Sequence, residues 1–226
     1  MKKYIFFLLL FFSILCSFSQ TSYSNLDRFE KEIRKFEAED QKSFPPSGGI
    51  VFYGSSSIRG WHETLHEDFA PLVVIPRGFG GSNMKEALYY SHRVLLPYKP
   101  KAVVLYEGDN DIAQGISAQM VADTFCEFVQ NLHKHLPETR VYFISIKPSI
   151  ARFAVWNEMK EANRLIEQEC LKSEFLTYID VACAMLDEQG NPKPELYLQD
   201  KLHITRDAYK IWTSILKPIL IKDNQK

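Results

Sequence analysis

The sequence predicts a single α/β domain in which a five-stranded parallel sheet is covered by helices on both faces. Five short apolar runs, each as long as a buried strand, alternate with segments whose apolar residues recur at helical spacing. Strands that alternate with helices form βαβ units, and a parallel sheet of such units needs a helical layer on each side. No linker, repeat or second compositional zone divides the 226 residues, a length that suits one domain.

Each expected element is an apolar run or an amphipathic segment bounded by polar, proline or glycine residues. The expected strands are residues 50–53, 72–75, 102–106, 141–146 and 176–179, and the expected helices are residues 24–41, 83–95, 117–135, 155–172 and 205–222. Ser117 and Thr205 stand where a side-chain oxygen can cap the expected helices 117–135 and 205–222. In open parallel sheets, ligands bind beyond the carboxyl ends of the strands, so the polar residues that follow each strand are the candidates for a site.

The first 19 residues are expected to be a secretory signal peptide. A basic start at residues 1–3 precedes a short apolar run and the small residues Ser17 and Ser19. We expect cleavage between Ser19 and Gln20, which leaves residues 20–226 as the mature domain, exported to the periplasm or the cell exterior. The apolar run is shorter than the ~20 residues that a membrane span needs, so we expect no span in the mature chain.

Charge and cysteine content narrow the function classes further. A formal net charge of -1 without a basic stripe gives no footprint for nucleic acid, so no nucleic-acid partner is expected. Cys16 suggests a lipoprotein, but the bulky Leu15 before it disfavours lipoprotein processing. The mature chain keeps Cys126, Cys170 and Cys183, an unclustered odd set that predicts buried thiols rather than a disulfide framework.

Four short motifs carry the chemistry, three of them directly after expected strands. They are Gly-Ser-Ser-Ser-Ile at residues 54–58, Gly-Phe-Gly-Gly-Ser at 78–82, Gly-Asp-Asn-Asp at 108–111 and Asp-Lys-Leu-His at 200–203. They supply a serine, a glycine N–H, an asparagine amide and an Asp/His pair, which are the groups that acyl transfer requires. Each motif alone is weak evidence, since serine triplets and aspartate-rich segments are common in turns. The ordered set favours a hydrolytic site.

The set resembles the SGNH hydrolases, also called GDSL-type esterases and acylhydrolases, over nearly all of the mature sequence. The first family block usually reads Gly-Asp-Ser-Leu or Gly-Asp-Ser-Ile; residues 51–56 take that place, with Ser55 where the family has aspartate, and residues 60–61 fit the continuation. The resemblance implies the flavodoxin-like three-layer α/β/α sandwich of that family. It also implies a serine hydrolase that acts on ester bonds and needs neither metal nor cofactor.

The family resemblance assigns a role to each motif. Ser56 is expected to be the nucleophile, with His203 as its general base and Asp200 as the residue that orients the histidine. The oxyanion hole is expected to comprise the N–H groups of Ser56 and Gly81 and the side-chain amide of Asn110. An amide suits this task because it donates hydrogen bonds without a charge that is costly to desolvate.

Other residues near the motifs have less specific expectations. Ser82 is the best alternative serine, but it stands at the start of an expected helix and is expected to cap it. The segment from Lys147 to Arg152, together with Trp156, follows the fourth strand and is a candidate for a pocket wall. Arg152 could meet an anionic substrate, although a surface arginine without such a role is the commoner outcome.

Residues 62–66 spell His-Glu-Thr-Leu-His, which matches the His-Glu-x-x-His pattern of zinc peptidases. On a helix, His62 and His66 would both face a zinc ion, with Glu86 as a third ligand. The flanks offer no long apolar helix, and Pro71 soon introduces the next strand. We therefore expect no metal site here.

The substrate is predicted only as a class. Family members cleave acetyl groups from sugars, short-chain esters, lysophospholipids and thioesters. Export and the lack of a lipid-binding segment favour removal of small acyl groups, above all acetyl, from carbohydrate. A lysophospholipase or a broad short-chain esterase or thioesterase is the alternative, and a non-catalytic carbohydrate-binding module is the alternative of another class. The sequence does not indicate the oligomeric state.

Overall fold

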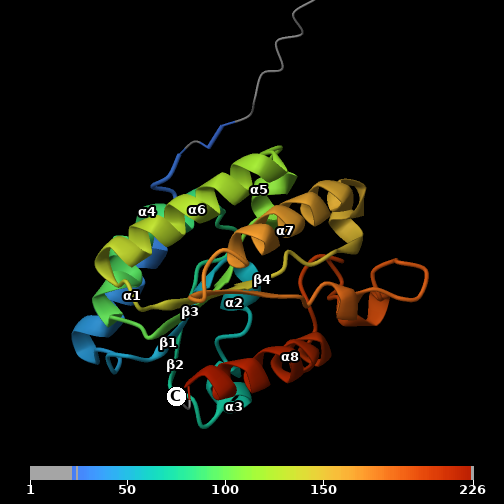
Figure 1. The fold of residues 1–226 in the computed structure, drawn as a ribbon. Coiled ribbons are helices and arrows are strands. Elements are labelled where there is room, and N and C mark those ends of the chain that lie inside the picture. Colours follow the sequence, from blue (N-terminus) through green and yellow to red (C-terminus); the bar gives the residue numbers. More distant parts are fainter. Residues whose placement is uncertain (1–21, 24, 225–226) are drawn as a thin grey trace, which may run out of the picture.

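The computed structural model describes residues 22–23 and 25–224, which form three layers around a parallel sheet (Figure 1). The strands are β1 (Ile50–Gly54), β2 (Val74–Gly78), β3 (Ala102–Tyr106), β4 (Arg140–Ile144) and β5 (Leu176–Ile179). All neighbouring strands run parallel, in the order β2-β1-β3-β4-β5. This is the flavodoxin-like strand order, so the expected fold class is confirmed. The expected signal peptide lies outside the described residues.

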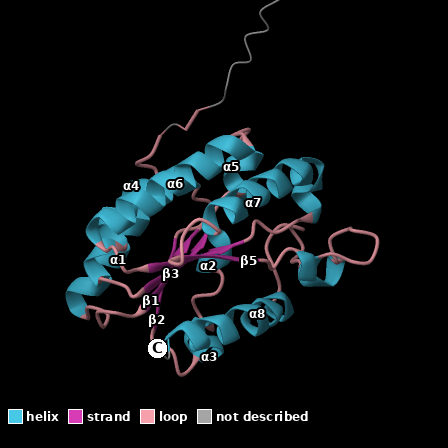
Figure 2. Ribbon diagram, viewed as in Figure 1, coloured by secondary structure: helices cyan, strands magenta, loops and turns pink. Residues whose placement is uncertain are grey.

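Helices cover both faces of the sheet (Figure 2). One layer contains α1 (Glu30–Lys42), α4 (Met84–Val94), α6 (Ala118–His135) and α7 (Trp156–Cys170), and the opposite layer contains α3 (Leu65–Phe69) and α8 (Arg206–Asn224). Two single-turn helices, α2 (Ser56–Arg59) and α5 (Asp109–Ala113), follow β1 and β3 directly. Short 3-10 turns are η1 (Leu96–Tyr98), η2 (Ile150–Val155), η3 (Cys183–Met185) and η4 (Pro194–Leu196).

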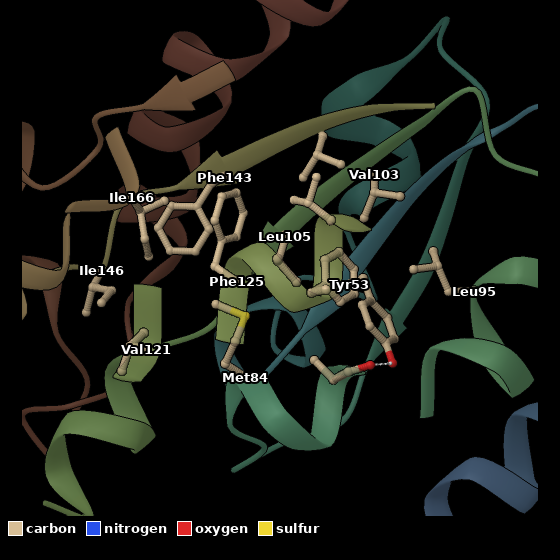
Figure 3. Packing of buried hydrophobic residues seen from close by; sticks show 14 of the residues in the cluster. Tyr53, Met84, Leu95, Val103, Leu105, Val121, Phe125, Phe143, Ile146 and Ile166 are labelled. Atoms are coloured by element: carbon tan, nitrogen blue, oxygen red, sulfur yellow. Dashed lines mark hydrogen bonds between the residues drawn. The ribbon is translucent and has the colours of Figure 1, made fainter. Parts of the chain in front are cut away.

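The alternation of side chains along the strands divides the interior into two cores. Val51 and Tyr53 point into the core beneath α1, α4, α6 and α7, part of which Figure 3 draws, whereas Ile50 and Phe52 point into the core beneath α3 and α8. Both faces of β1 are therefore fully buried, as a strand between two helical layers must be. The Tyr53 hydroxyl donates to the Ala87 carbonyl at 2.7 Å, which fixes α4 to the sheet.

Parallel register brings the carboxyl ends of three strands to one level. Gly54 pairs with Gly78 of β2 and with Tyr106 of β3. The ladder continues one residue further, because the Ser55 N–H donates to the Tyr106 carbonyl at 3.1 Å. The first three motifs therefore leave the sheet at the same edge, next to one another.

Three expected elements had wrong bounds, and one of them is the fourth strand, which was expected at residues 141–146 but spans Arg140–Ile144. The second strand was expected at residues 72–75, but it begins at Val74 and continues to Gly78, because pairing with β1 sets its limits. It includes Pro76, which an edge strand tolerates because its N–H side needs no partner. The first helix begins at Glu30 rather than at residue 24, since residues 26–29 form turns.

Other expectations can be compared residue by residue. Both expected caps are confirmed: Ser117 Oγ accepts from the Met120 N–H at 3.3 Å, and Thr205 Oγ1 accepts from the Ala208 N–H at 3.4 Å. Cys183 was expected to be buried but is exposed, because it stands on a 3-10 turn beyond β5. Over the part of the chain that the structure describes, no helix is long and apolar enough to cross a membrane.

Candidate active site

The first motif forms an abrupt turn from strand to helix. Gly54 adopts a φ of +129°, and a Cβ at this position would lie 2.1 Å from the Tyr106 carbonyl oxygen, so only glycine fits. The chain passes at once into α2, in which Ser56 is the first residue and is half-buried. The first N–H groups of a helix have no acceptor within the helix. Within residues 25–224, the Ser56 N–H and hydroxyl accordingly have no hydrogen-bond partner.

The second motif packs its glycines against α2. A Cβ at Gly78 would lie 2.3 Å from the backbone nitrogen of Arg59, so the close contact between this loop and α2 requires glycine. Gly81 adopts a φ of +94°, and its carbonyl accepts from Arg28 Nη2 at 2.8 Å. The Gly81 N–H finds no acceptor in the described part of the chain. The loop therefore presents this free backbone donor next to α2.

Ser82 does not cap α4, which corrects the expectation. Asn83 is the cap, because its Oδ1 accepts from the Glu86 N–H at 3.0 Å while Glu86 Oε2 accepts from the Asn83 N–H at 2.9 Å. The Ser82 hydroxyl instead donates to Glu107 Oε1 at 2.5 Å, and its side chain is fully buried. A buried hydroxyl with this partner is not available as an alternative nucleophile.

The third motif opens α5 and holds the Asn110 amide from two sides. Asn110 Nδ2 donates to the Ser82 carbonyl at 2.8 Å, and Asn110 Oδ1 accepts from Arg152 Nη1 at 3.0 Å. A flipped amide would set oxygen against the carbonyl and NH₂ against the guanidinium, so these partners select one orientation. The Nδ2 group has two hydrogens, and the second remains free to donate.

A buried ionic cluster lies directly behind this amide. Asp109 accepts from Lys147 Nζ at 3.0 Å and from Arg152 Nη1 at 2.6 Å. Burial alone would raise the pKa of Asp109, but these two cations hold it below its usual value. Glu107 has the opposite environment, since burial and the charge of Asp111 raise its pKa well above the usual range. The surroundings therefore favour the ionised form of Asp109 and the protonated form of Glu107.

The fourth motif forms a compact Asp/His pair ahead of α8. Asp200 Oδ2 lies 2.6 Å from His203 Nδ1, while Asp200 Oδ1 accepts from the Leu202 and His203 N–H groups at 3.0 Å and 2.9 Å. The hydrogen bond with His203 and these backbone donors lower the pKa of Asp200 to about 2. Lys201 adopts a left-handed φ of +59°, a conformation that glycine adopts more readily than residues with a Cβ.

Tertiary contacts place this loop beside the first motif. The Tyr209 hydroxyl on α8 donates to the Ser57 carbonyl on α2 at 2.8 Å. On the other side, the Ala151 N–H donates to the Lys201 carbonyl at 3.0 Å, which ties the loop to the segment that carries Arg152. The Asp/His loop is thus held between α2 and the residues that orient Asn110.

The structure brings most of the expected site residues into defined relations. Asp200 and His203 are hydrogen-bonded to each other, and the motifs of Ser56, Gly81 and Asn110 share the carboxyl edge of the sheet. In the described residues no hydrogen bond joins Ser56 to His203. The side chains of His203 and Asp200 are 38% and 48% exposed, so the pair is open to a ligand from solvent.

The His-Glu-x-x-His segment has the wrong structure for zinc. His62 lies before α3 and His66 lies in it, so one helix does not present both imidazoles. His62 Nε2 accepts from the Gly78 N–H at 3.0 Å, and Glu86 is buried against Arg28 and the Asn83 N–H. Within residues 22–23 and 25–224, no group of three or more His, Cys, Asp or Glu side chains could hold a metal ion.

Some residues behind the site were missed or only partly anticipated from the sequence. Arg152 was a candidate pocket wall, but its guanidinium binds Asp109 and orients Asn110; Trp156 is 7% exposed and packs in the core. Lys147 was a candidate for the pocket wall, but it binds Asp109, and Glu107 was not recognised. The available signal for Glu107 was its position, because it is a charged residue placed directly after the fully apolar strand β3, at the edge where sites form.

The structure is similar to several solved hydrolase folds. A protein from Streptococcus pneumonia superposes with a TM-score of 0.76 at 20% identity, covering 86% of this chain and 94% of the other. A GDSL-like lipase from Bacteroides thetaiotaomicron gives a TM-score of 0.71 at 20% identity, with 84% and 98% covered. A catalytic mutant of an acetylxylan esterase from Geobacillus stearothermophilus gives a TM-score of 0.61 at 12% identity, with 76% and 93% covered. At these identities the likeness establishes the fold.

A search of curated proteins finds no match. A family model does match, from residue 45 to residue 211, and this span contains all four motifs. The matched span is well over half of the chain and coincides with the sheet and the site at its carboxyl edge. This protein therefore belongs to the GDSL-like lipase/acylhydrolase family.

Proposed function

We propose that this chain is a serine esterase that uses Ser56 as nucleophile, His203 as general base and Asp200 as the residue that orients the histidine. The observation that carries this proposal is a set of unpaired donors at one sheet edge. The Ser56 N–H, the Gly81 N–H and the second hydrogen of Asn110 Nδ2 have no acceptor among the described residues. Free N–H groups gathered beside a serine hydroxyl are what an oxyanion hole requires.

In the proposed reaction, Ser56 Oγ attacks the ester carbonyl while His203 Nε2 takes the hydroxyl proton. Asp200 holds the proton of His203 Nδ1 and stabilises the imidazolium without accepting that proton. His203 then protonates the departing alcohol as the acyl-enzyme forms. Water attacks the acyl-enzyme while His203 accepts a proton from that water. His203 then returns the proton to Ser56 Oγ as the bond to the acyl group breaks and the acid is released. This chemistry uses only side chains and backbone of the chain.

The substrate proposed is an ester with a small acyl group, above all acetyl, on a carbohydrate. The open Asp/His pair supports this, because an exposed site can receive an acyl group from a bulky acceptor. Catalytic mutants of the acetylxylan esterase with the same fold replace a serine, an aspartate and a histidine, the last two three positions apart, as Asp200 and His203 are here. We also propose that residues 1–19 direct export and that the mature domain is residues 20–226.

The first test is hydrolysis of a short-chain aryl acetate by purified residues 20–226, beside Ser56→Ala and the surface control Ser214→Ala. Wild type and the control should turn over, while Ser56→Ala should fall to the background rate. A fluorophosphonate probe should also label a peptide that contains Ser56 and lose this label in the alanine variant. Equal activity of Ser56→Ala and wild type would overturn the assignment of the nucleophile. No turnover and no labelling would favour a carbohydrate-binding module.

A further inference from the structure

One guanidinium group next to the proposed site has no partner among the residues that the structure describes. Arg59 is the last residue of α2, one helical turn from Ser56, and its side chain is exposed. Every other arginine in residues 25–224 donates to a carboxylate or carbonyl oxygen of the chain. In that same range the Arg59 side chain makes neither a hydrogen bond nor an ion pair. Its N–H donors are therefore available to a ligand.

The position of this guanidinium is defined by the loop of the second motif. A Cβ at Gly80 would lie 2.2 Å from Arg59 Cζ and 2.5 Å from both terminal nitrogens. The group thus lies flat against the Gly80 backbone, one residue before the Gly81 donor. It also comes from the same helical turn as Ser56. The guanidinium therefore lies against the loop of the second motif, on the helical turn that begins with Ser56.

The unpaired charge at this place is that of Arg59. Two neighbouring cations, Arg77 and Lys35, form ion pairs with Asp40 and Glu39. An unpaired guanidinium attracts an anionic substrate and lowers the cost of bringing its charge to the site. A planar guanidinium with free donors matches a carboxylate or a phosphate, which it can bind through two parallel hydrogen bonds.

We propose that Arg59 binds an anionic group, a carboxylate or a phosphate, on the alcohol part of the ester, so that the preferred substrates are acylated acidic sugars. This inference rests on the proposed function, because it concerns the leaving alcohol of the same reaction. The acyl group lies over Ser56 and the free N–H donors. The sugar then extends toward Gly80, where its charge meets the guanidinium.

The test compares acetate release from a neutral acetylated methyl glucoside, the corresponding glucuronoside and the corresponding 6-phosphate. Wild type should have a kcat/KM about 10- to 100-fold higher for at least one anionic ester than for the neutral one, the range expected for a charge-assisted hydrogen-bonded pair. Arg59→Gln should lose this preference while its neutral rate changes less than about twofold. Arg164→Gln, which removes an exposed charge on α7, should retain it. If the glucuronoside is preferred, the anionic group that Arg59 binds is a carboxylate, and if the 6-phosphate is preferred, it is a phosphate.

Two further variants keep the inference testable if Arg59→Gln folds poorly. Arg59→Lys retains the charge but loses the planar fork and should keep only part of the preference. Gly80→Ala adds a Cβ that must displace the guanidinium and should weaken the preference without altering the side-chain charge. An anionic preference that is absent in wild type, or that survives in both Arg59→Gln and Gly80→Ala, overturns the inference. If hydrolysis of the neutral ester does not depend on Ser56, the proposed function itself has failed.

Discussion

We expect Arg152→Ala to lower kcat strongly although it lowers the free energy of unfolding only modestly. Arg152 Nη1 donates to both Asn110 Oδ1 at 3.0 Å and Asp109 Oδ1 at 2.6 Å, so one substitution removes the orienting partner of the amide and one cation from the buried carboxylate. Without this donor, the Asn110 amide can rotate and present its oxygen to the oxyanion. Complete loss of one oxyanion donor costs ~10²–10³ in kcat. Partial disorder of the same donor should cost about 10- to 100-fold in kcat.

The expected stability change follows from the environment of Asp109. Arg152 is 22% exposed and Lys147 only 1% exposed, so the two cations that hold this carboxylate are not equivalent. A hydrogen bond to a charged group contributes ~1.5–3 kcal/mol, and the partial exposure of Arg152 favours the lower end. Removing one partner of a fully buried pair costs more, ~3–5 kcal/mol. Arg152→Ala should therefore destabilise the fold less than a substitution of Lys147.

Lys147→Met is the matched control. It disrupts the same ionic cluster, fills a similar volume and removes a side chain that makes no hydrogen bond to Asn110 among the described residues. We expect Lys147→Met to lower the free energy of unfolding by more than Arg152→Ala and to lower kcat by less. This reversed order separates orientation of the amide from general damage to the fold.

The assay is kcat and KM on an aryl acetate, measured well below the unfolding transition, together with urea unfolding of each variant. The double variant Asn110→Ala/Arg152→Ala completes the cycle. If Arg152 acts through Asn110, its removal should have little further effect on kcat once the amide is gone. The reasoning is refuted if the two kcat losses multiply, or if Lys147→Met lowers kcat as much as Arg152→Ala does.

Three other predictions follow from individual contacts. Burial raises the pKa of the Glu107 carboxyl well above its usual range, so this carboxyl binds a proton when the chain folds. The free energy of unfolding of the wild type therefore falls as the pH rises above the ordinary glutamate pKa, and Glu107→Gln removes the carboxyl responsible. The stability gain of Glu107→Gln in urea unfolding should therefore grow from pH 5 to pH 8, by up to ~1.4 kcal/mol per unit, and a gain that is constant with pH contradicts this. Tyr23→Phe removes the 2.6 Å hydrogen bond to Asp111 Oδ1 and should lower the free energy of unfolding by about 1–2 kcal/mol. It should also speed proteolysis of the N-terminal segment. An unchanged free energy of unfolding would show that this hydrogen bond contributes nothing to stability. Gly78→Ala would place a Cβ 2.3 Å from a backbone nitrogen of α2, so it should displace Ser56. We expect kcat on an aryl acetate to fall at least about 10-fold. An unchanged kcat would mean that α2 adjusts freely.

Local sequence patterns predicted the bounds of a strand or helix well where its buried residues set those bounds. β3 spans Ala102–Tyr106, as its apolar run predicts, and α6 begins after the expected Ser117 cap. β2 was misplaced because its edges depend on pairing with β1 and not on its own composition, which includes Pro76. The start of α1 was also misplaced, because the apolar spacing of Leu26 and Phe29 is helical although these residues form turns.

The hydrogen-bond partners of Ser82 illustrate what a sequence pattern leaves open. A serine ahead of an amphipathic run has the features of a helix cap, yet the neighbouring Asn83 caps α4. Ser82 turns to Glu107, which follows a different strand and is 25 residues away. The helix-capping propensity of a serine gives only one of the hydrogen bonds that its hydroxyl can make. A partner that is distant in the sequence decides which hydrogen bond forms.

The sequence by itself determined the fold class, the five strands and the four motifs that define the family, because hydrophobic periodicity and motif order are local properties of the chain. Only the tertiary structure decided that Arg152 and Ser82 orient the Asn110 amide, that Lys147 and Arg152 keep Asp109 ionised, and that Arg59 remains unpaired against Gly80. Each of these facts depends on groups from separate segments that meet at one edge of the sheet. Hydrogen bonds and charge interactions act over a few ångströms, so they are fixed only when parallel register and the docking of α8 bring those segments together.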